Sequence, residues 1–282
     1  MFLILKKERL NKFMTKMEID APLIAQKAKA GQFIILRVNE TGERIPLTIA
    51  DYDRTRGIVT IIYQVVGKTT ALLDSLNKGD YILDFVGPLG KPTFTKGYKS
   101  IAVIGGGTGC AIAYPQAKAL FEEGKNVDII AGFKNKDLII LEKEMKEKSN
   151  NTVIITDDGS NGKKGFVTDA LRENIEGGKA YDLVIAIGPL PMMKAVCALT
   201  KEHKIKTIVS MNPIMIDGTG MCGGCRLKVG GKMKFACVDG PDFDGHEVDF
   251  DEAMLRLGLF KDRERKSMQE YECNLLKQRS ED

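Results

Sequence analysis

The first 95 residues contain short segments rich in Ile, Val, Thr, Tyr and Phe, separated by residues that favour turns. β-Branched and aromatic side chains pack well on the pleated surface of a β-sheet. Strands are therefore predicted at Gln32–Val38, Ile45–Ala50, Gly57–Val66 and Asp80–Val86, with one short helix at Thr69–Leu76. Several short strands at this spacing predict a small antiparallel β-barrel.

The pattern changes at Ser100, where apolar runs begin to alternate with helical stretches. The run Ser100–Ile104 leads into a glycine-rich segment and a helix that ends near Glu123. Further strands are predicted at Val127–Phe133, Thr152–Thr156, Leu183–Ile187 and Thr207–Val209, with helices at Leu141–Lys148, Gly165–Ile175 and Pro191–His203. Such alternation predicts right-handed crossovers and a parallel sheet with helices on both faces.

The remainder of the chain differs again. Residues 210–250 hold three of the six cysteines, many glycines and little regular pattern, and residues 251–282 mix apolar and charged positions. We therefore predict a β + α/β protein with four parts. These are a β-barrel over residues 1–95, a nucleotide-binding α/β domain over 96–209, a small cysteine-containing domain over 210–250 and a charged helical tail over 251–282.

Composition and charge exclude several classes of protein. Among 282 residues there are 42 Lys and Arg against 38 Asp and Glu, a net charge of +4 that is too small to indicate nucleic-acid binding. The longest apolar region, Tyr181–Thr200, is broken by glycine, prolines and a lysine, so it does not fit a bilayer-spanning helix. The N-terminus lacks the charge order of a signal peptide. We expect a cytoplasmic protein that binds neither nucleic acid nor a membrane.

Asp217, Cys222, Cys225 and Cys237 give the strongest chemical signal, with the spacing D-x4-C-x2-C-x11-C. Plant-type iron–sulfur proteins use C-x4-C-x2-C and a distant fourth cysteine. An aspartate carboxylate at the first position has the same formal charge as a thiolate, so the spacing predicts a 2Fe–2S cluster. Two alternatives are open: a structural zinc on the three cysteines and His246, or reduced thiols in a turn.

The segment Gly105–Gly109 joins a predicted strand to a predicted helix. Such a turn brings backbone N–H groups and a helix N-terminus to a dinucleotide pyrophosphate, and the alternative is an ordinary tight turn. No acidic residue stands at the end of the second strand, where Phe133-Lys134-Asn135 occur. The residues alone therefore do not choose between NAD and NADP.

The predicted barrel contributes Arg44–Ile49 and Gly67–Thr70, which in isolation are typical of ordinary barrel structure. Beside a pyridine-nucleotide domain and a one-electron cluster they indicate a flavin. A flavin accepts two electrons as a hydride and releases them one at a time.

Together, these motifs resemble ferredoxin–NADP reductase-type flavoproteins with an appended 2Fe–2S domain. The resemblance is carried by Arg44-x-Pro46-Leu47-Thr48, Gly67-x-x-Thr70, Gly87-Pro88-Leu89-Gly90, Gly105–Gly109, Gly188–Met192 and the cysteine loop. Within that superfamily the chain resembles electron-transfer subunits of dihydroorotate dehydrogenase. It is more similar to the small subunits of NADH-dependent reduced ferredoxin:NADP⁺ oxidoreductases, a family also described as sulfide dehydrogenase subunits.

This resemblance implies a role for each matching residue, and it implies no catalytic acid or base. FAD would be held by Arg44, Pro46, Leu47, Thr48, Gly67, Lys68, Thr69 and Thr70. NAD(H) would be held by Gly106, Gly107, Thr108, Gly188, Pro189 and Met192, and the cluster by Asp217, Cys222, Cys225 and Cys237.

The resemblance also implies an oxidoreductase subunit that moves electrons between NAD(H), FAD and a 2Fe–2S cluster. In that family a larger, NADPH-binding subunit related to the glutamate synthase small subunit carries a second flavin and 4Fe–4S clusters. The heterodimer couples oxidation of ferredoxin and NADH to NADP⁺ reduction by electron bifurcation or its reverse, and ferredoxin is reached through the larger subunit. The alternatives are an electron-transfer subunit for dihydroorotate dehydrogenase or sulfide dehydrogenase and, from another class, a zinc-stabilised nucleotide-binding module.

Overall fold

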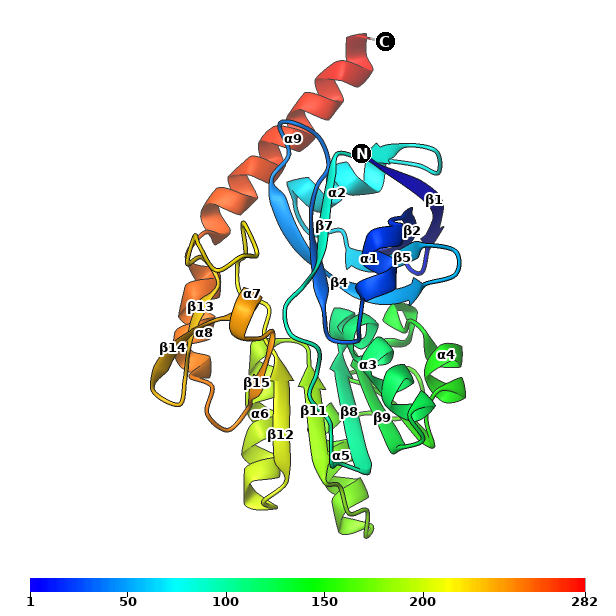
Figure 1. The fold of residues 1–282 in the computed structure, drawn as a ribbon, viewed down its shortest axis with the longest axis vertical. Helices are drawn as coiled ribbons and strands as arrows, with labels where there is room; N and C mark the ends of the chain where they lie inside the picture. The colour runs from blue at the N-terminus through cyan, green and yellow to red at the C-terminus, as the bar shows by residue number, and fades with distance from the viewer. Residues whose placement is uncertain (282) are drawn as a thin grey trace.

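The fold of the computed structural model is built on two large β-sheets and a small β-hairpin (Figure 1). The structure describes residues 1–281, so the final residue of the predicted tail lies outside the described residues. Among the described helices, none is both long enough and apolar enough to cross a membrane. The two sheets meet end to end, and this junction creates the candidate site.

The N-terminal sheet is antiparallel and curled, as the sequence predicts. Its strands follow the order β6-β1-β2-β5-β4-β3-β7. Their bounds are β1 Phe2–Arg9, β2 Met14–Asp20, β3 Phe33–Arg37, β4 Arg44–Asp53, β5 Ile58–Gln64, β6 Tyr81–Ile82 and β7 Asp84–Leu89. The inner face buries an aliphatic core that includes Ile4, Met17, Ile34, Leu36 and Ile61.

Two features of this region differ from the sequence prediction. The first twenty residues form β1 and β2, neither of which was predicted. The region contains two helices, α1 (Pro22–Lys27) and α2 (Lys68–Ser75), so the prediction of a single helix was wrong. In β2 two of the apolar positions are methionines, and they alternate with Lys16, Glu18 and other polar residues, so the strand depends on pairing with β1 and β5 more than on intrinsic preference.

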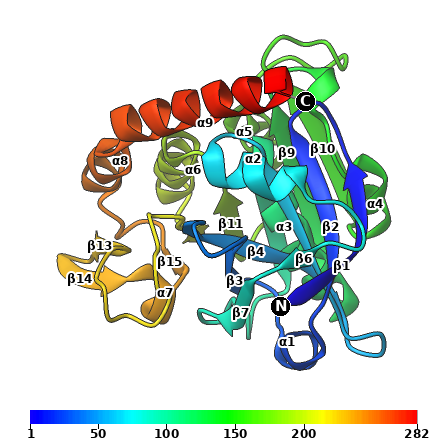
Figure 2. The same ribbon diagram turned by 90° about the horizontal axis from the view of Figure 1, so that it is seen from above.

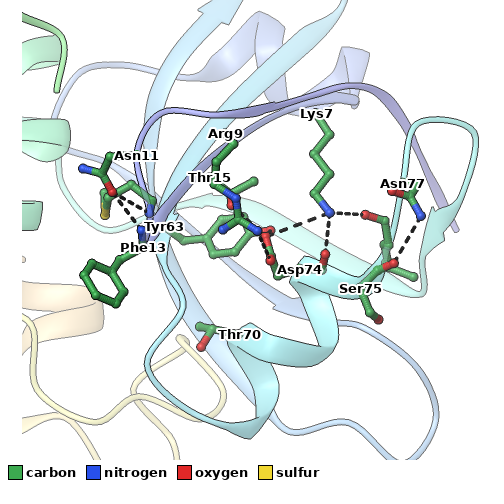
Figure 3. A network of polar contacts seen from close by, with 12 residues as sticks. Lys7, Arg9, Asn11, Phe13, Thr15, Tyr63, Thr70, Asp74, Ser75 and Asn77 are labelled. Carbon is green, nitrogen blue, oxygen red and sulfur yellow. Dashed lines mark hydrogen bonds and ion pairs between the residues drawn. The ribbon is translucent and has the colours of Figure 1, made fainter. Parts of the chain in front are cut away.

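Helix α2 is fixed to the sheet by Asp74 (Figure 3). Thr15 Oγ1 donates a hydrogen bond of 2.7 Å to the Asp74 carboxylate, which also pairs with Arg9, and Lys7 Nζ bonds the Asp74 carbonyl oxygen. Burial favours the protonated carboxyl, but the Thr15 and Arg9 hydrogen bonds outweigh it and hold the pKa of Asp74 below its ordinary value. This polar cluster anchors the C-terminal end of α2 to the sheet.

The second sheet has the strand order β10-β9-β8-β11-β12-β15, of which the first five are parallel. Its elements are β8 Ser100–Gly106, α3 Cys110–Glu122, β9 Asn126–Phe133, α4 Glu142–Glu147, β10 Asn151–Thr156, α5 Val167–Glu176, β11 Leu183–Ile187, α6 Leu190–Glu202 and β12 Lys206–Ser210, with 3₁₀ turns at Gly107–Gly109 and Lys136–Leu138. Helices α3 and α4 pack on one face, and α5 and α6 on the other. The chain changes direction across the sheet between β8 and β11, where such folds bind nucleotides.

Residues beyond 210 contain more regular structure than the sequence predicts. They form the hairpin β13 (Arg226–Val229) and β14 (Lys232–Phe235), the short helix α7 (Ala236–Asp239), and strand β15 (Asp242–Asp244). Two helices follow, α8 (Phe250–Gly258) and α9 (Lys261–Glu281). Strand β15 pairs antiparallel with β12 and so adds to the second sheet. Helix α9 extends from α8 to lie beside α2 of the N-terminal sheet (Figure 2).

Asp242 lies where the main parts of the molecule meet. It is on β15 opposite Ser210 of β12, and its carboxylate accepts a 2.6 Å hydrogen bond from Thr93 in the connection between the two large sheets. A Cβ at Gly31 of the N-terminal region would lie 3.4 Å from the same carboxylate. Burial raises the pKa of Asp242 to about 6, although hydroxyl hydrogen bonds from Thr93 and Ser210 oppose the shift. The junction therefore holds a carboxyl group that is harder to ionise than in the unfolded chain.

We predict that this carboxyl makes stability depend on pH. Its pKa is higher in the folded chain than the ordinary 3.8, so the folded state loses stability as pH rises from about 4 to about 6. Two pKa units correspond to about 3 kcal/mol. Asp242→Asn should remove this loss, as measured by denaturant unfolding at pH 4.5 and pH 7.5.

The matched control is Asp244→Asn on the same strand, whose carboxylate pairs with Lys206 at the surface. This control should keep the pH dependence of the wild type. An Asp242→Asn variant with the same dependence as the wild type would show that Asp242 is not its source.

Candidate functional site

A cavity of about 420 Å³ lies between the N-terminal sheet and the carboxyl ends of β8 and β11. Seven of the predicted cofactor-binding residues line it: Pro46, Leu47 and Thr48 of β4, Thr70 of α2, Thr108 after β8, and Gly188 and Pro189 after β11. Ser210 at the end of β12, with Met211 and Asn212 after it, closes another side. The cavity thus brings together both regions that the sequence assigns to cofactors.

Glycines allow β8 and β11 to approach each other at the base of this cavity. A Cβ at Gly109 would lie 2.3 Å from the Ile187 carbonyl oxygen, and one at Gly188 would lie 3.1 Å from the backbone of Gly106. The Met192 side chain covers both strand ends, because its Sδ would lie 2.3 Å from a Cβ at Gly106. The predicted nucleotide residues Gly106, Gly188 and Met192 therefore meet, and a larger side chain at Gly109 would force the turn after β8 away from the backbone at the end of β11.

The remaining predicted flavin residues lie around the N-terminus of α2 and the start of β4. Thr70 Oγ1 accepts a 3.0 Å hydrogen bond from Gly67 N, and Thr69 donates one of 3.2 Å to Glu43. Arg44 and Lys68 are exposed, and neither lines the cavity. Gly107, also outside the cavity lining, adopts φ +55° in the turn after β8.

Several lining residues had no signal in the sequence. Tyr63 of β5, Asn212 and Leu257 of α8 reach the cavity only because distant segments pack together. Burial, followed by the negative charge of Asp74, raises the pKa of Tyr63, so its hydroxyl stays protonated. No local pattern marks these three residues.

The cysteine loop brings its predicted ligands together as two pairs. The Sγ atoms of Cys225 and Cys237 are buried and lie 3.2 Å apart. Asp217 accepts hydrogen bonds of 2.9 Å from the N–H groups of Thr219 and Cys222, which hold the pKa of Asp217 below its ordinary value. A 2Fe–2S cluster has two irons and four protein ligands, so two pairs suit it better than one fourfold site.

Protons compete with iron for the sulfur atoms of the buried pair, Cys225 and Cys237. Burial, and then the neighbouring Cys225 thiol, raises the pKa of Cys237 to about 12. Ligation requires the thiolate, so binding of iron would release this proton. Once deprotonated, the two neighbouring sulfur atoms would be soft ligands of the kind that iron–sulfur clusters use.

The zinc alternative is not supported. His246 Nε2 lies 3.0 Å from Thr200 Oγ1, on the side of α6. Among the side chains that the structure describes, no three of His, Cys, Asp or Glu converge as a single metal ion would require.

Comparisons with known proteins agree with this geometry. Residues 103–198 match the model of the oxidoreductase NAD-binding domain, and residues 212–249 match that of the iron–sulfur cluster binding domain of dihydroorotate dehydrogenase B. A solved structure of an NADH-dependent reduced ferredoxin-NADP oxidoreductase superposes with a TM-score of 0.90 at 43% identity, covering 95% of this chain and 97% of that one. Fold and site thus define an electron-transfer oxidoreductase subunit of the ferredoxin-reductase type.

Two relatives with known descriptions identify the family to which the chain belongs. The dihydroorotate dehydrogenase B electron transfer subunit homolog of Thermotoga maritima is 44% identical, over 95% of this chain and 94% of its own length. The corresponding electron transfer subunit of Fusobacterium nucleatum is 33% identical, over 84% of this chain and 93% of its own length. The chain belongs to the family of dihydroorotate dehydrogenase B electron transfer subunits and their homologues.

We predict that Gly109→Ala damages the base of the cavity. The new methyl group would meet backbone atoms of Ile187 and Gly188 at 2.3 and 2.7 Å, and backbone cannot move aside as a flexible side chain does. We expect a loss of about 1–3 kcal/mol in the free energy of unfolding, together with weaker NAD(H) binding. Thermal unfolding and calorimetric titration with NADH measure the two effects.

Gly258→Ala in α8 is the matched control, because no atom lies within 4 Å of the position of its Cβ. This variant should be as stable as the wild type or slightly more so, since alanine is the better helix former. If Gly109→Ala and Gly258→Ala had the same stability and the same affinity for NADH, the close approach between the turn after β8 and the end of β11 would be contradicted.

Proposed function

We propose that this chain passes electrons between NAD(H) and a larger partner subunit, using FAD and a 2Fe–2S cluster. The complex would act in the cytoplasm and couple oxidation of ferredoxin and NADH to reduction of NADP⁺. The observation that carries the proposal is the single cavity lined by β4, by the turns after β8 and β11, and by the segment that leads into the cysteine loop. Groups held by these segments would lie within contact distance of one another.

In this proposal, the N-terminal sheet holds the flavin. Pro46, Leu47 and Thr48 face the cavity and would support the flavin ring system. The first turn of α2, at Lys68, Thr69 and Thr70, would provide backbone N–H groups for the pyrophosphate after the Gly67 turn, and the Arg44 and Lys68 side chains would add positive charge nearby. Bound FAD would supply the conversion between a two-electron hydride and single electrons.

The turns after β8 and β11 would hold NAD(H). Gly106, Gly107 and Thr108 precede the first turn of α3, whose N-terminus favours a phosphate, and Gly188 and Pro189 form the facing wall. Met192 covers both strand ends and would limit how deep the nicotinamide can enter. The protein's part is to position the rings and exclude water, without an acid or base.

The two pairs in the cysteine loop would each hold one iron. Cys225 and Cys237 form the buried pair, and Asp217 and Cys222 form the outer pair. Cys222 and its neighbour Met221 are exposed, Met221 to 89%. The outer iron is therefore the natural point from which an electron leaves toward a partner.

The second candidate is an electron-transfer subunit for a dihydroorotate-oxidising enzyme, which the family's relatives favour. The structural similarity of 0.90 in TM-score over 97% of the ferredoxin-NADP oxidoreductase chain favours the first candidate. Co-purification distinguishes the two. A pyridine-nucleotide-binding flavoprotein with 4Fe–4S clusters supports the first, and a TIM-barrel flavoprotein supports the second.

We predict that anaerobically purified protein gives the EPR signal of a spin-½ 2Fe–2S centre after reduction with dithionite. Asp217→Ala should weaken or abolish this signal and lower the iron content, because one iron would lose a ligand. Asp217→Cys should keep the signal, since a thiolate replaces the carboxylate.

Two controls sharpen this test. Cys222→Ala should lose iron, and Cys273→Ala, which alters an exposed cysteine of α9, should not. Full iron and an unchanged signal in Asp217→Ala would reject Asp217 as a ligand. A metal-loaded wild type without a signal would reject the cluster.

A further inference from the structure

One ion pair joins β4 to α3, two elements that line the cofactor cavity from different sheets. Lys118 Nζ of α3 lies 2.9 Å from each carboxylate oxygen of Asp51 on β4. Among the ion pairs that the structure describes, it is the only one between the N-terminal sheet and the second sheet with its helices. This contact therefore links the part of the molecule assigned to the flavin with the part assigned to the nucleotide.

The two residues lie at similar distances from the cavity along their elements. Thr48, the last residue of β4 that lines the cavity, comes three residues before Asp51, which is about 10 Å along a strand. Ile112 of α3, which also lines the cavity, comes six residues before Lys118, which is about 9 Å along a helix. The ion pair therefore opposes any sliding of β4 past α3 that would change how the two sides of the cavity face each other.

Local structure directs the two side chains toward each other. A bulge interrupts the pairing of β4 with β5 just before Asp51, and bulges re-aim the side chains beside them. The Asp51 carboxylate also accepts a 2.9 Å hydrogen bond from Tyr52 N, which restricts its rotation. On α3, Glu122 is one turn beyond Lys118, but Glu122 is paired with Lys148 at 2.8 Å. Lys118 thus pairs across the junction and not along its own helix.

Apolar packing between the same parts does not supply this alignment. Met14 of β2 and Ile62 of β5 belong to the apolar cluster that α3 forms with the second sheet. Such packing holds the parts together, but it is not directional. The ion pair is directional, although it adds little to stability, because the Lys118 side chain is 25% exposed and the Asp51 side chain 42%. Its main effect is therefore on alignment.

We propose that Lys118 and Asp51 are positioning residues for hydride transfer between NADH and the flavin. This inference rests on the proposed function of the cavity. Neither residue lines the cavity, so the pair acts by keeping α3 and β4 in register. Hydride transfer requires reacting atoms about 3–3.5 Å apart, and a displacement of about 1 Å can slow a reaction about a hundredfold. A contact that contributes little to stability can therefore have a large effect on rate.

The test is anaerobic stopped-flow reduction of the FAD-loaded chain at a series of NADH concentrations. In Lys118→Met and in Asp51→Asn, we expect the limiting rate of flavin reduction to fall at least about tenfold. The NADH concentration that gives half of this rate should change less than about twofold, because the residues that bind NADH are unaltered. The double variant should be no slower than either single variant, since both remove the same contact. Lys118→Arg keeps the charge and should restore most of the wild-type rate.

Lys146→Met is the matched control, because Lys146 pairs with Glu142 within the single helix α4. This variant should be reduced as fast as the wild type. The thermal midpoints of Lys118→Met and Asp51→Asn should lie within about 3 °C of the wild type, as expected for a partly exposed pair.

Equal limiting rates in the wild type and Lys118→Met would overturn the positioning role and leave the proposed function intact. A larger fall in the thermal midpoint of both variants would also overturn it, because the pair would then serve folding. A wild type that binds NADH and FAD but is not reduced would contradict the proposed function itself, and the positioning role with it.

Discussion

The close approach of β8 and β11 at their carboxyl ends is the constraint on which the site depends. Gly109 lies against the Ile187 carbonyl, and Gly188 lies against Gly106, so these positions cannot accept a larger side chain without moving backbone. This approach forms one wall of the cavity and leaves room for β4 to form the other. A nicotinamide held by the turns after β8 and β11 can contact a flavin held by β4 only if these two walls stay on opposite sides of the one cavity.

The other walls are held by polar contacts between parts that are distant in sequence. Asp74 fixes the C-terminal end of α2 against β1 and β2 through Thr15 and Arg9, and Thr70 of the same helix lines the cavity. Asp242 joins the end of β12 to the connection between the sheets through Thr93. The cysteine loop lies between β12 and β15, so the same junction ties it to the cofactor cavity.

Much of the fold could be predicted because its elements carry strong local signals. The parallel strands are continuous apolar runs, and the turn Gly105–Gly109 comes at the end of one of them, so the second sheet and the position of this turn were predicted correctly. Strand β1 was missed because its apolar and charged residues stand in two blocks without alternation, and β2 because its methionines and charged residues have no strong β preference. Strand β15, Asp-Phe-Asp, is too short to give a pattern. Tyr63, Asn212 and Leu257 could not be predicted to line the cavity, because only tertiary packing brings them there.

The central claim is that NADH and FAD meet in one cavity of this chain. The most direct test is anaerobic stopped-flow mixing of the FAD-loaded chain, without any partner, with NADH or with NADH deuterated at the transferred position. The account predicts that NADH bleaches the flavin absorbance and that deuterium slows the bleaching. A flavin that stays oxidised in the presence of NADH, although both molecules are bound, would contradict the account.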